Sequence, residues 1–150
     1  MKDQPDSETE LRARALRLLA RREHSRWELA RKLAPHAESS EVVSGILESL
    51  AQRKQLSEAR FAEERARQLS RKYGAARIRQ DLKAKGVSEE LISRFSSSEN
   101  EMQKAREILE RKYRTPAATR EEKAKRMRFL QSRGFSSEII FKLLSARSEG

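Results

Sequence analysis

Apolar residues recur along most of the chain at intervals of three and four, the spacing that places side chains on one face of an α-helix. Leu11, Ala15 and Leu18 form the first such stripe, and Leu143 and Leu144 belong to the last. Runs of β-branched residues, which favour strands, are missing. The pattern predicts an all-α chain of about nine short helices, bounded by capping residues and breakers.

Helix boundaries are indicated by serine and threonine at the starts and by proline and glycine at the ends. A hydroxyl followed three residues later by glutamate predicts a capping box, in which each side chain satisfies one backbone amide of the first turn. Four such pairs occur: Ser7–Glu10, Ser25–Glu28, Ser98–Glu101 and Thr119–Glu122. Further starts are predicted at Ser39 or Ser40, Ser57, Ser88 and Ser136, and ends at Pro35, Gly74, Gly86, Pro116 and Gly134.

The predicted helices fall into three groups of three. Residues 82–92 and 130–140 share one pattern: Leu, two spacers, a base, Gly, an apolar residue, Ser, and later two aliphatic residues. Gly86 and Gly134 follow the last helical residue, where a left-handed turn favours glycine, and the two helices around each turn have the helix-turn-helix shape. We predict an elongated tandem array, with a disordered segment at 1–6 and three-helix repeats at 7–55, 56–97 and 98–147.

Composition indicates thin cores and a cationic surface. Only 36% of residues are hydrophobic and 38% are charged, which favours several small cores over one large one. Lysine and arginine number 34 against 23 acidic residues, a formal net charge of +11. Such a surface attracts nucleic acid, an anionic membrane or an acidic protein.

The bases gather in three clusters, at residues 71–85, 111–114 and 123–133, and we predict that these bind a polyanion. Tyr73 and Tyr113 end equivalent helices beside basic residues, but their place on the apolar stripes favours core packing over base stacking, and Trp27 is likewise expected in a core. The candidate contact residues are Arg71, Lys72, Arg77, Arg79, Lys83, Lys85, Arg111, Lys112, Lys125, Arg126, Arg128 and Arg133.

Catalytic chemistry finds little support in the sequence. The chain has no cysteine, and His24 and His36 have no second ligand at metal-site spacing. No glycine-rich phosphate loop occurs, so we expect no enzyme activity, no metal and no cofactor. The polar start is unlike a signal peptide, and no apolar run approaches the roughly 20 residues of a membrane span. We therefore expect a cytoplasmic monomer that uses neither membrane nor small-molecule substrate.

Residues 72–86, KYGAARIRQDLKAKG, closely resemble the signature of the RecX family of recombination regulators. Residues 15–33 resemble the family's first repeat, residues 56–61 the start of the second, and residues 129–135 part of the third. The resemblance extends over about residues 10–145, the same stretch in which the helical repeat is found. Where the family often has paired aspartates, this chain has Ser57 and Glu58, and we expect the helix still to begin there.

The resemblance implies both a fold and a function. RecX proteins are tandem three-helix repeats that bind the RecA nucleoprotein filament, lie along its helical groove and lower its ATPase, strand-exchange and coprotease activities. They also bind single- and double-stranded DNA weakly. The alternative from the residues alone is a stand-alone helix-turn-helix DNA-binding protein, against which residues 87–95 and 135–144 offer few side chains to read bases. A protein-only scaffold also stays open.

Overall fold

The computed structural model describes residues 4–149, and the side chains of residues 4–145. In this part of the chain the regular structure is entirely helical, with nine α-helices and one 3-10 helix, so the predicted all-α class is confirmed. The elements are α1 (Glu8–Arg21), α2 (Arg26–Leu33), η1 (Ala34–His36), α3 (Ser40–Gln52), α4 (Glu58–Leu69), α5 (Ala75–Ala84), α6 (Glu89–Phe95), α7 (Glu101–Lys112), α8 (Arg120–Ser132) and α9 (Ser137–Glu149).

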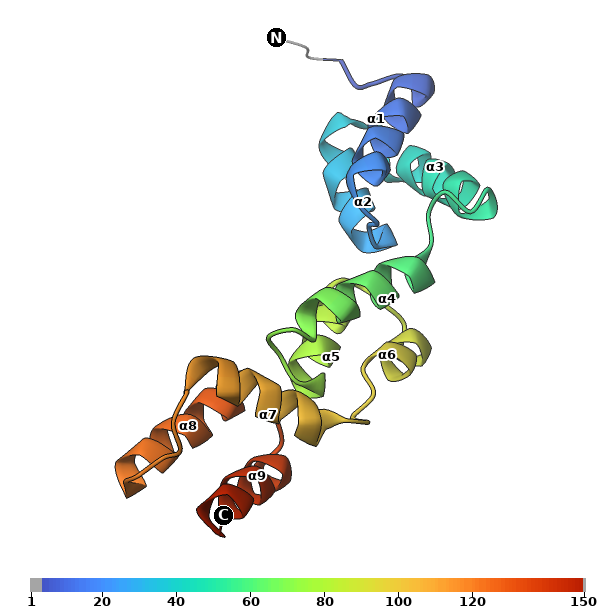
Figure 1. Cartoon of the computed structure of the whole chain (residues 1–150). Helices are drawn as coiled ribbons and strands as arrows, with labels where there is room; N and C mark the ends of the chain where they lie inside the picture. Colours follow the sequence, from blue (N-terminus) through green and yellow to red (C-terminus); the bar gives the residue numbers. More distant parts are fainter. Residues whose placement is uncertain (1–3, 150) are drawn as a thin grey trace.

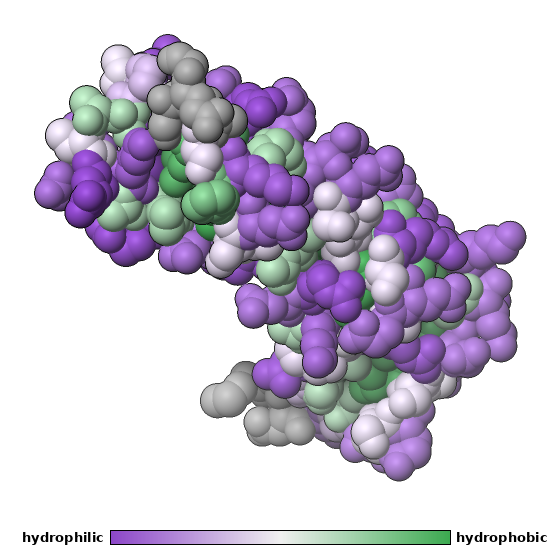
Figure 2. All heavy atoms as spheres, turned by 90° about the horizontal axis from the view of Figure 1, so that it is seen from below, coloured by the Kyte–Doolittle hydropathy of each residue, from purple (hydrophilic) through white to green (hydrophobic). Residues whose placement is uncertain are grey.

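The helices form three successive modules: α1–α3 (module 1), α4–α6 (module 2) and α7–α9 (module 3). Figure 1 shows the modules following one another, with the two ends of the chain at opposite ends of the molecule. Seen from below, the molecule has a crescent outline with a mainly hydrophilic surface (Figure 2). The predicted elongated array of three-helix units is therefore confirmed.

Each module buries a small core of its own. Leu11, Leu29 and Leu50 are fully buried in the apolar cluster of module 1. Leu82 is fully buried in a second cluster, in module 2, and Leu109 in a third, in module 3. In every closely packed helix pair, both helices belong to the same module. The modules are therefore stabilised by three thin cores and not by one continuous core, as a repeat array requires.

The helix caps follow the sequence in most places. Ser7 and Ser25 form complete capping boxes with Glu10 and Glu28. Ser57 caps α4 by accepting a hydrogen bond from the backbone N–H of Arg60, so the helix does begin at the site of the missing paired aspartates.

The predicted box at Ser98 is wrong. Asn100, with a φ of 64°, is the N-cap of α7, and the Glu101 carboxylate accepts a hydrogen bond from the backbone of α5 instead of capping its own helix. At α8 the box is half formed: Thr119 accepts from the Glu122 N–H, but the Glu122 carboxylate accepts from Ala118.

Order begins before the predicted end of the disordered segment at 1–6. Asp6 is buried, its backbone N–H donates to the His36 carbonyl at 2.8 Å, and its carboxylate pairs with Arg14 at 3.0 Å. An ion pair and a backbone hydrogen bond tie Asp6 to module 1, so that part of the expectation is corrected. Residues 1–3 lie outside the described residues.

The close packing of the Gly134 turn leads to a first prediction, on stability. Gly134 has a φ of 91°, and a Cβ there would lie 2.5 Å from the Arg77 Cγ and 2.7 Å from the Arg77 backbone nitrogen. Gly134→Ala should therefore lower the free energy of unfolding by about 2 kcal/mol or more, from backbone strain and overpacking together. The matched control is Gly45→Ala in α3, where a Cβ meets nothing within 4 Å, and which should raise stability by about 1 kcal/mol. Urea unfolding of both variants measures the difference, and equal effects would contradict the packing argument.

A second prediction concerns pH. His24 is 1% exposed, with Nδ1 3.1 Å from the Arg22 carbonyl and Nε2 2.9 Å from Lys32 Nζ. Burial lowers the pKa of His24 below its usual 6.5. Since the unfolded chain takes up this proton first, the stability due to neutral His24 is complete above 6.5 and is lost as the pH falls toward the folded pKa.

The melting temperature should therefore fall between about pH 7.5 and pH 5.5, and fall less in His24→Gln than in the wild type. His36→Gln is the control and should behave as the wild type does. An identical pH dependence in wild type and His24→Gln would contradict the assignment.

Candidate polyanion-binding surface

Modules 2 and 3 are joined through the first turn of α5. The Gly74 N–H donates to the Arg133 carbonyl at 2.6 Å, and the Ala75 N–H donates to Glu101 Oε2 at 3.0 Å. A Cβ on Gly74 would lie 2.6 Å from the Gly134 carbonyl oxygen, so only glycine allows this approach. The start of α5 is therefore fixed against the turn between α8 and α9.

Modules 1 and 2 meet through an equivalent contact. The Arg26 N–H, at the start of α2, donates to the carboxylate of Glu58, the first residue of α4. The turn at Gly86 packs on the Cβ of Trp27, as the turn at Gly134 packs on Arg77. Burial raises the pKa of Glu58 above its ordinary value, although the Arg26 N–H and charge oppose this.

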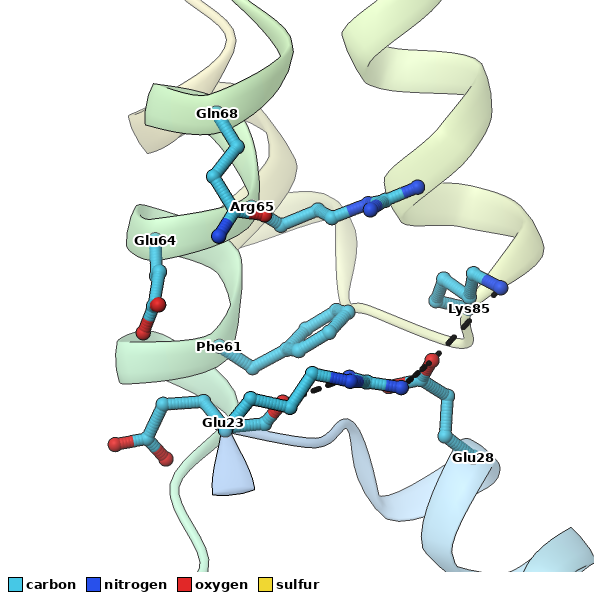
Figure 3. A pocket seen from close by; sticks show the side chains of 8 residues that line it. Glu23, Glu28, Phe61, Glu64, Arg65, Gln68 and Lys85 are labelled. Carbon is cyan, nitrogen blue, oxygen red and sulfur yellow. Dashed lines mark hydrogen bonds and ion pairs between the residues drawn. The ribbon is translucent and has the colours of Figure 1, made fainter. Parts of the chain in front are cut away.

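The first junction pairs its cations with carboxylates. Glu28 of α2 accepts two hydrogen bonds from Arg22, each at 3.1 Å, and its carboxylate lies 3.8 Å from Lys85 Nζ. Figure 3 shows Glu28 beside Lys85, below the ring of Phe61. Burial alone would raise the pKa of Glu28. Hydrogen bonds from Arg22 and from the Ser25 backbone, together with the charges of Arg22 and Lys85, outweigh burial and lower this pKa below its ordinary value. Lys85, a predicted polyanion contact, therefore already has a carboxylate partner.

The second junction places cations on aromatic rings. The Arg77 guanidinium carbon lies 4.5 Å from the centroid of Tyr73, and that of Arg133 lies 5.4 Å from the same ring. Arg133 also lies 4.9 Å from the centroid of Phe129, and Lys112 Nζ lies 5.2 Å from it. These distances are in the range of cation–π attraction, which holds a cation in place without cancelling its charge.

Backbone carbonyls hold the same side chains. Arg77 donates to the Ser132 carbonyl at 2.7 Å, and Arg133 donates to that of Lys72 at 3.4 Å. Arg111 donates to the carbonyl of Arg71. Contacts with rings and carbonyls thus bring residues of the first, second and third predicted clusters together across one boundary. We call this set the junction cluster: Arg77, Arg111, Lys112 and Arg133, whose side chains make these contacts, with Arg71 and Lys72, whose backbone carbonyls accept two of them.

The acidic residues Asp81 and Glu101, near the junction cluster, pair with cations outside it. Asp81 is the only acid between residues 71 and 85, and it forms two hydrogen bonds with Arg65 of α4, at 2.8 and 2.9 Å. The hydrogen bonds that Arg65 donates to Asp81 raise the pKa of Arg65. Glu101 pairs with Lys104 at 3.0 Å. The ion pairs of modules 2 and 3, in the part of the chain that the structure describes, therefore leave the junction cluster with its positive charge.

The remaining predicted contacts are not in this cluster. Arg79 pairs with Glu89 at 3.3 Å, and Lys83 is exposed on the same helix. Lys125 and Arg128 are exposed on α8.

Arg126 is a correction. It is 6% exposed, and its guanidinium lies 4.5 Å from the centroid of Tyr113, so it packs inside module 3 and does not face a partner.

Three family models match the chain in order. They describe the first, second and third three-helix domains of RecX and match residues 12–50, 57–94 and 99–144. The regulatory protein RecX of Ralstonia pickettii is 38% identical over 147 residues, which are 97% of this chain and 92% of that protein. Its counterpart in Neisseria meningitidis serogroup C is 43% identical over 131 residues, covering 87% of this chain and 86% of the relative. The chain belongs to the RecX family.

Solved RecX structures share this fold. A crystal structure of RecX from Lactobacillus salivarius matches with a TM-score of 0.78 at 20% identity. The match covers 95% of this chain and 97% of the Lactobacillus salivarius chain. Another crystal structure of regulatory protein RecX has a TM-score of 0.71 at 22% identity. The match covers 93% of this chain and 73% of the chain in that structure. In the described part of this RecX-family chain, no three metal-binding side chains come together, and no helix is both long and apolar enough to cross a bilayer.

Sequence reasoning missed the aromatic part of the site. Tyr73 was expected to pack in a core, and no role was predicted for Phe129, but both present a ring to neighbouring bases. The available signal was the short distance in sequence between Tyr73 and Arg77. Nothing in the sequence places Arg133 on the same ring, because that contact crosses the boundary between modules. Trp27 is a second miss: it is 43% exposed and does not lie in a core.

The junction cluster yields a third prediction. A variant with Lys72→Gln, Arg77→Gln and Lys112→Gln should bind single-stranded DNA several-fold more weakly than the wild type at equal salt. The slope of log affinity against log salt should fall by about one for each phosphate that the variant no longer neutralises. Fluorescence anisotropy of a labelled oligonucleotide at several salt concentrations measures both quantities.

The control variant removes the same charge from exposed residues that pair with acids of their own helices: Arg67→Gln, Arg94→Gln and Lys142→Gln. It should keep most of the affinity and slope. If both variants lose affinity equally, net charge alone governs binding and the cluster has no special role.

Proposed function

We propose that this RecX-family protein regulates the RecA recombinase by binding along the RecA–DNA filament, where it lowers the ATPase, strand-exchange and coprotease activities. The junction cluster is the main contact in this proposal. The observation that carries it is the gathering of bases from modules 2 and 3 on aromatic rings and carbonyls, with no carboxylate partner in the described ion pairs. A cation held in this way keeps its charge for an anionic partner.

The elongated shape suits a repeating partner. A filament presents the same protein surface and DNA backbone at regular intervals. Three modules joined in fixed order can contact several of these at once, and weak contacts then combine into a much stronger one. The crescent outline in Figure 2 is consistent with a molecule that follows a curved groove. The exposed bases Lys83 and Lys125, on α5 and α8, extend the cationic surface beyond the junction.

The fourth prediction tests inhibition directly. Added below one molecule per RecA protomer, the protein should slow ATP hydrolysis by RecA on single-stranded DNA and slow cleavage of LexA. A variant with Lys72→Glu, Arg77→Glu and Lys112→Glu should require at least several-fold more protein for the same inhibition, because each change replaces attraction to the filament by repulsion.

The matched variant carries Arg67→Glu, Arg94→Glu and Lys142→Glu, with the same net charge, and should inhibit as the wild type does. Circular dichroism of both variants checks that helix content is kept. Absence of any effect on RecA at every ratio would reject the proposed function. If the protein bound DNA tightly by itself while leaving RecA activity unchanged, the stand-alone DNA-binding alternative would replace it.

A further inference from the structure

Trp27 lies at an open groove between modules 1 and 2. Its Cβ packs against Gly86, where the φ of 80° and the absence of a side chain allow the close approach. The indole is held at its base while 43% of the residue stays exposed. The groove measures about 560 Å³, within the range of small-molecule sites, and its lining includes Trp27, Ala30, Val43, Leu47, Arg26 and Arg31.

The chemistry of the groove combines an aromatic face with positive charge. Ala30, Val43 and Leu47 form an apolar wall from α2 and α3. Both charged residues that line the groove are arginines, and no carboxylate lines it. Arg31 lies over the indole with its guanidinium carbon 4.8 Å from the ring centroid. Arg26 pairs with Glu48, which is outside the lining, at 3.1 Å, so Arg31 is the principal cation for a ligand.

We propose that this groove binds a base of single-stranded nucleic acid, with the base stacked on Trp27 and the adjacent phosphate at Arg31. Stacking on an aromatic side chain beside a basic one is a general means of holding single strands, because every base has a flat π-face. Duplex bases are already stacked and paired, so they do not enter. The inference deepens the proposed function and rests on its DNA contact, since it gives module 1 a contact with the DNA strand separate from the junction cluster.

Trp27 is the only tryptophan in the chain, so its fluorescence reports on the groove directly. Titration with an oligothymidylate of about 20 nucleotides should quench the emission to a saturating level, with much less quenching by a duplex at equal nucleotide concentration. Anisotropy of the labelled oligonucleotide measures binding in parallel. Unchanged tryptophan emission while anisotropy shows binding would overturn the inference, and so would an absence of binding.

Variants separate stacking from folding. Trp27→Ala should weaken oligothymidylate binding at least five-fold, as expected when one base is no longer stacked. Trp27→Phe keeps the Cβ packed on Gly86 and should weaken binding less. The control is Phe141→Ala, which removes another exposed aromatic side chain, at 68% exposure in module 3, and should leave the affinity unchanged. Equal affinity for Trp27→Ala and the wild type would contradict the inference.

A further titration, with a peptide, tests whether the groove binds protein instead of nucleic acid. An acidic, leucine-containing peptide should quench far less than the oligonucleotide, and stronger quenching by the peptide would overturn the assignment to nucleic acid. None of these measurements contains RecA. Failure of the RecA inhibition assay therefore rejects the proposed function, whereas unchanged tryptophan emission during oligonucleotide binding rejects only the Trp27 site.

Discussion

A carboxylate at the start of one module bonds a backbone amide at the start of the second helix of the module before it, and the arrangement of the whole array depends on this contact. Glu58 accepts from Arg26, and Glu101 accepts from Ala75. The amides at a helix start have no partner inside the helix and are the positive end of its dipole, so a carboxylate is well suited to them. Each apolar core ends within its module, which leaves these polar contacts and the glycine turns to orient one module on the next.

The two junctions share this geometry but differ in charge. At the first, Glu28 pairs with Arg22 and Lys85, and Glu23 pairs with Arg60, so each of these cations has a carboxylate partner. At the second, aromatic rings and carbonyls take the place of acids. One mode of assembly thus produces a joint with carboxylate-paired cations between modules 1 and 2 and a cationic surface between modules 2 and 3.

This difference gives the function a physical basis. An arginine paired with a carboxylate must give up that partner before it binds a phosphate, whereas an arginine on a tyrosine ring keeps its charge and has its orientation restricted in advance. The junction cluster therefore favours an anionic partner, and the Trp27 groove adds an aromatic contact at the other junction. Contacts at both junctions suit a partner that extends along the array.

The sequence by itself determined the helices, the repeat and the family, because helical periodicity, caps and glycine turns are local properties of the chain. It failed where a side chain acts across a module boundary: Glu101 leaves its expected capping box to bond Ala75, and Trp27, expected in a core, packs its Cβ against Gly86 of the next module and stays exposed. Among the predicted cations, local charge density could not separate Lys85 and Arg79, which have carboxylate partners, or Arg126, which is buried, from Arg77 and Arg133, which lie on one ring. Only the tertiary structure decided this, because the contacts of Lys85 with Glu28 and of Arg133 with Tyr73 join different modules, far apart in sequence.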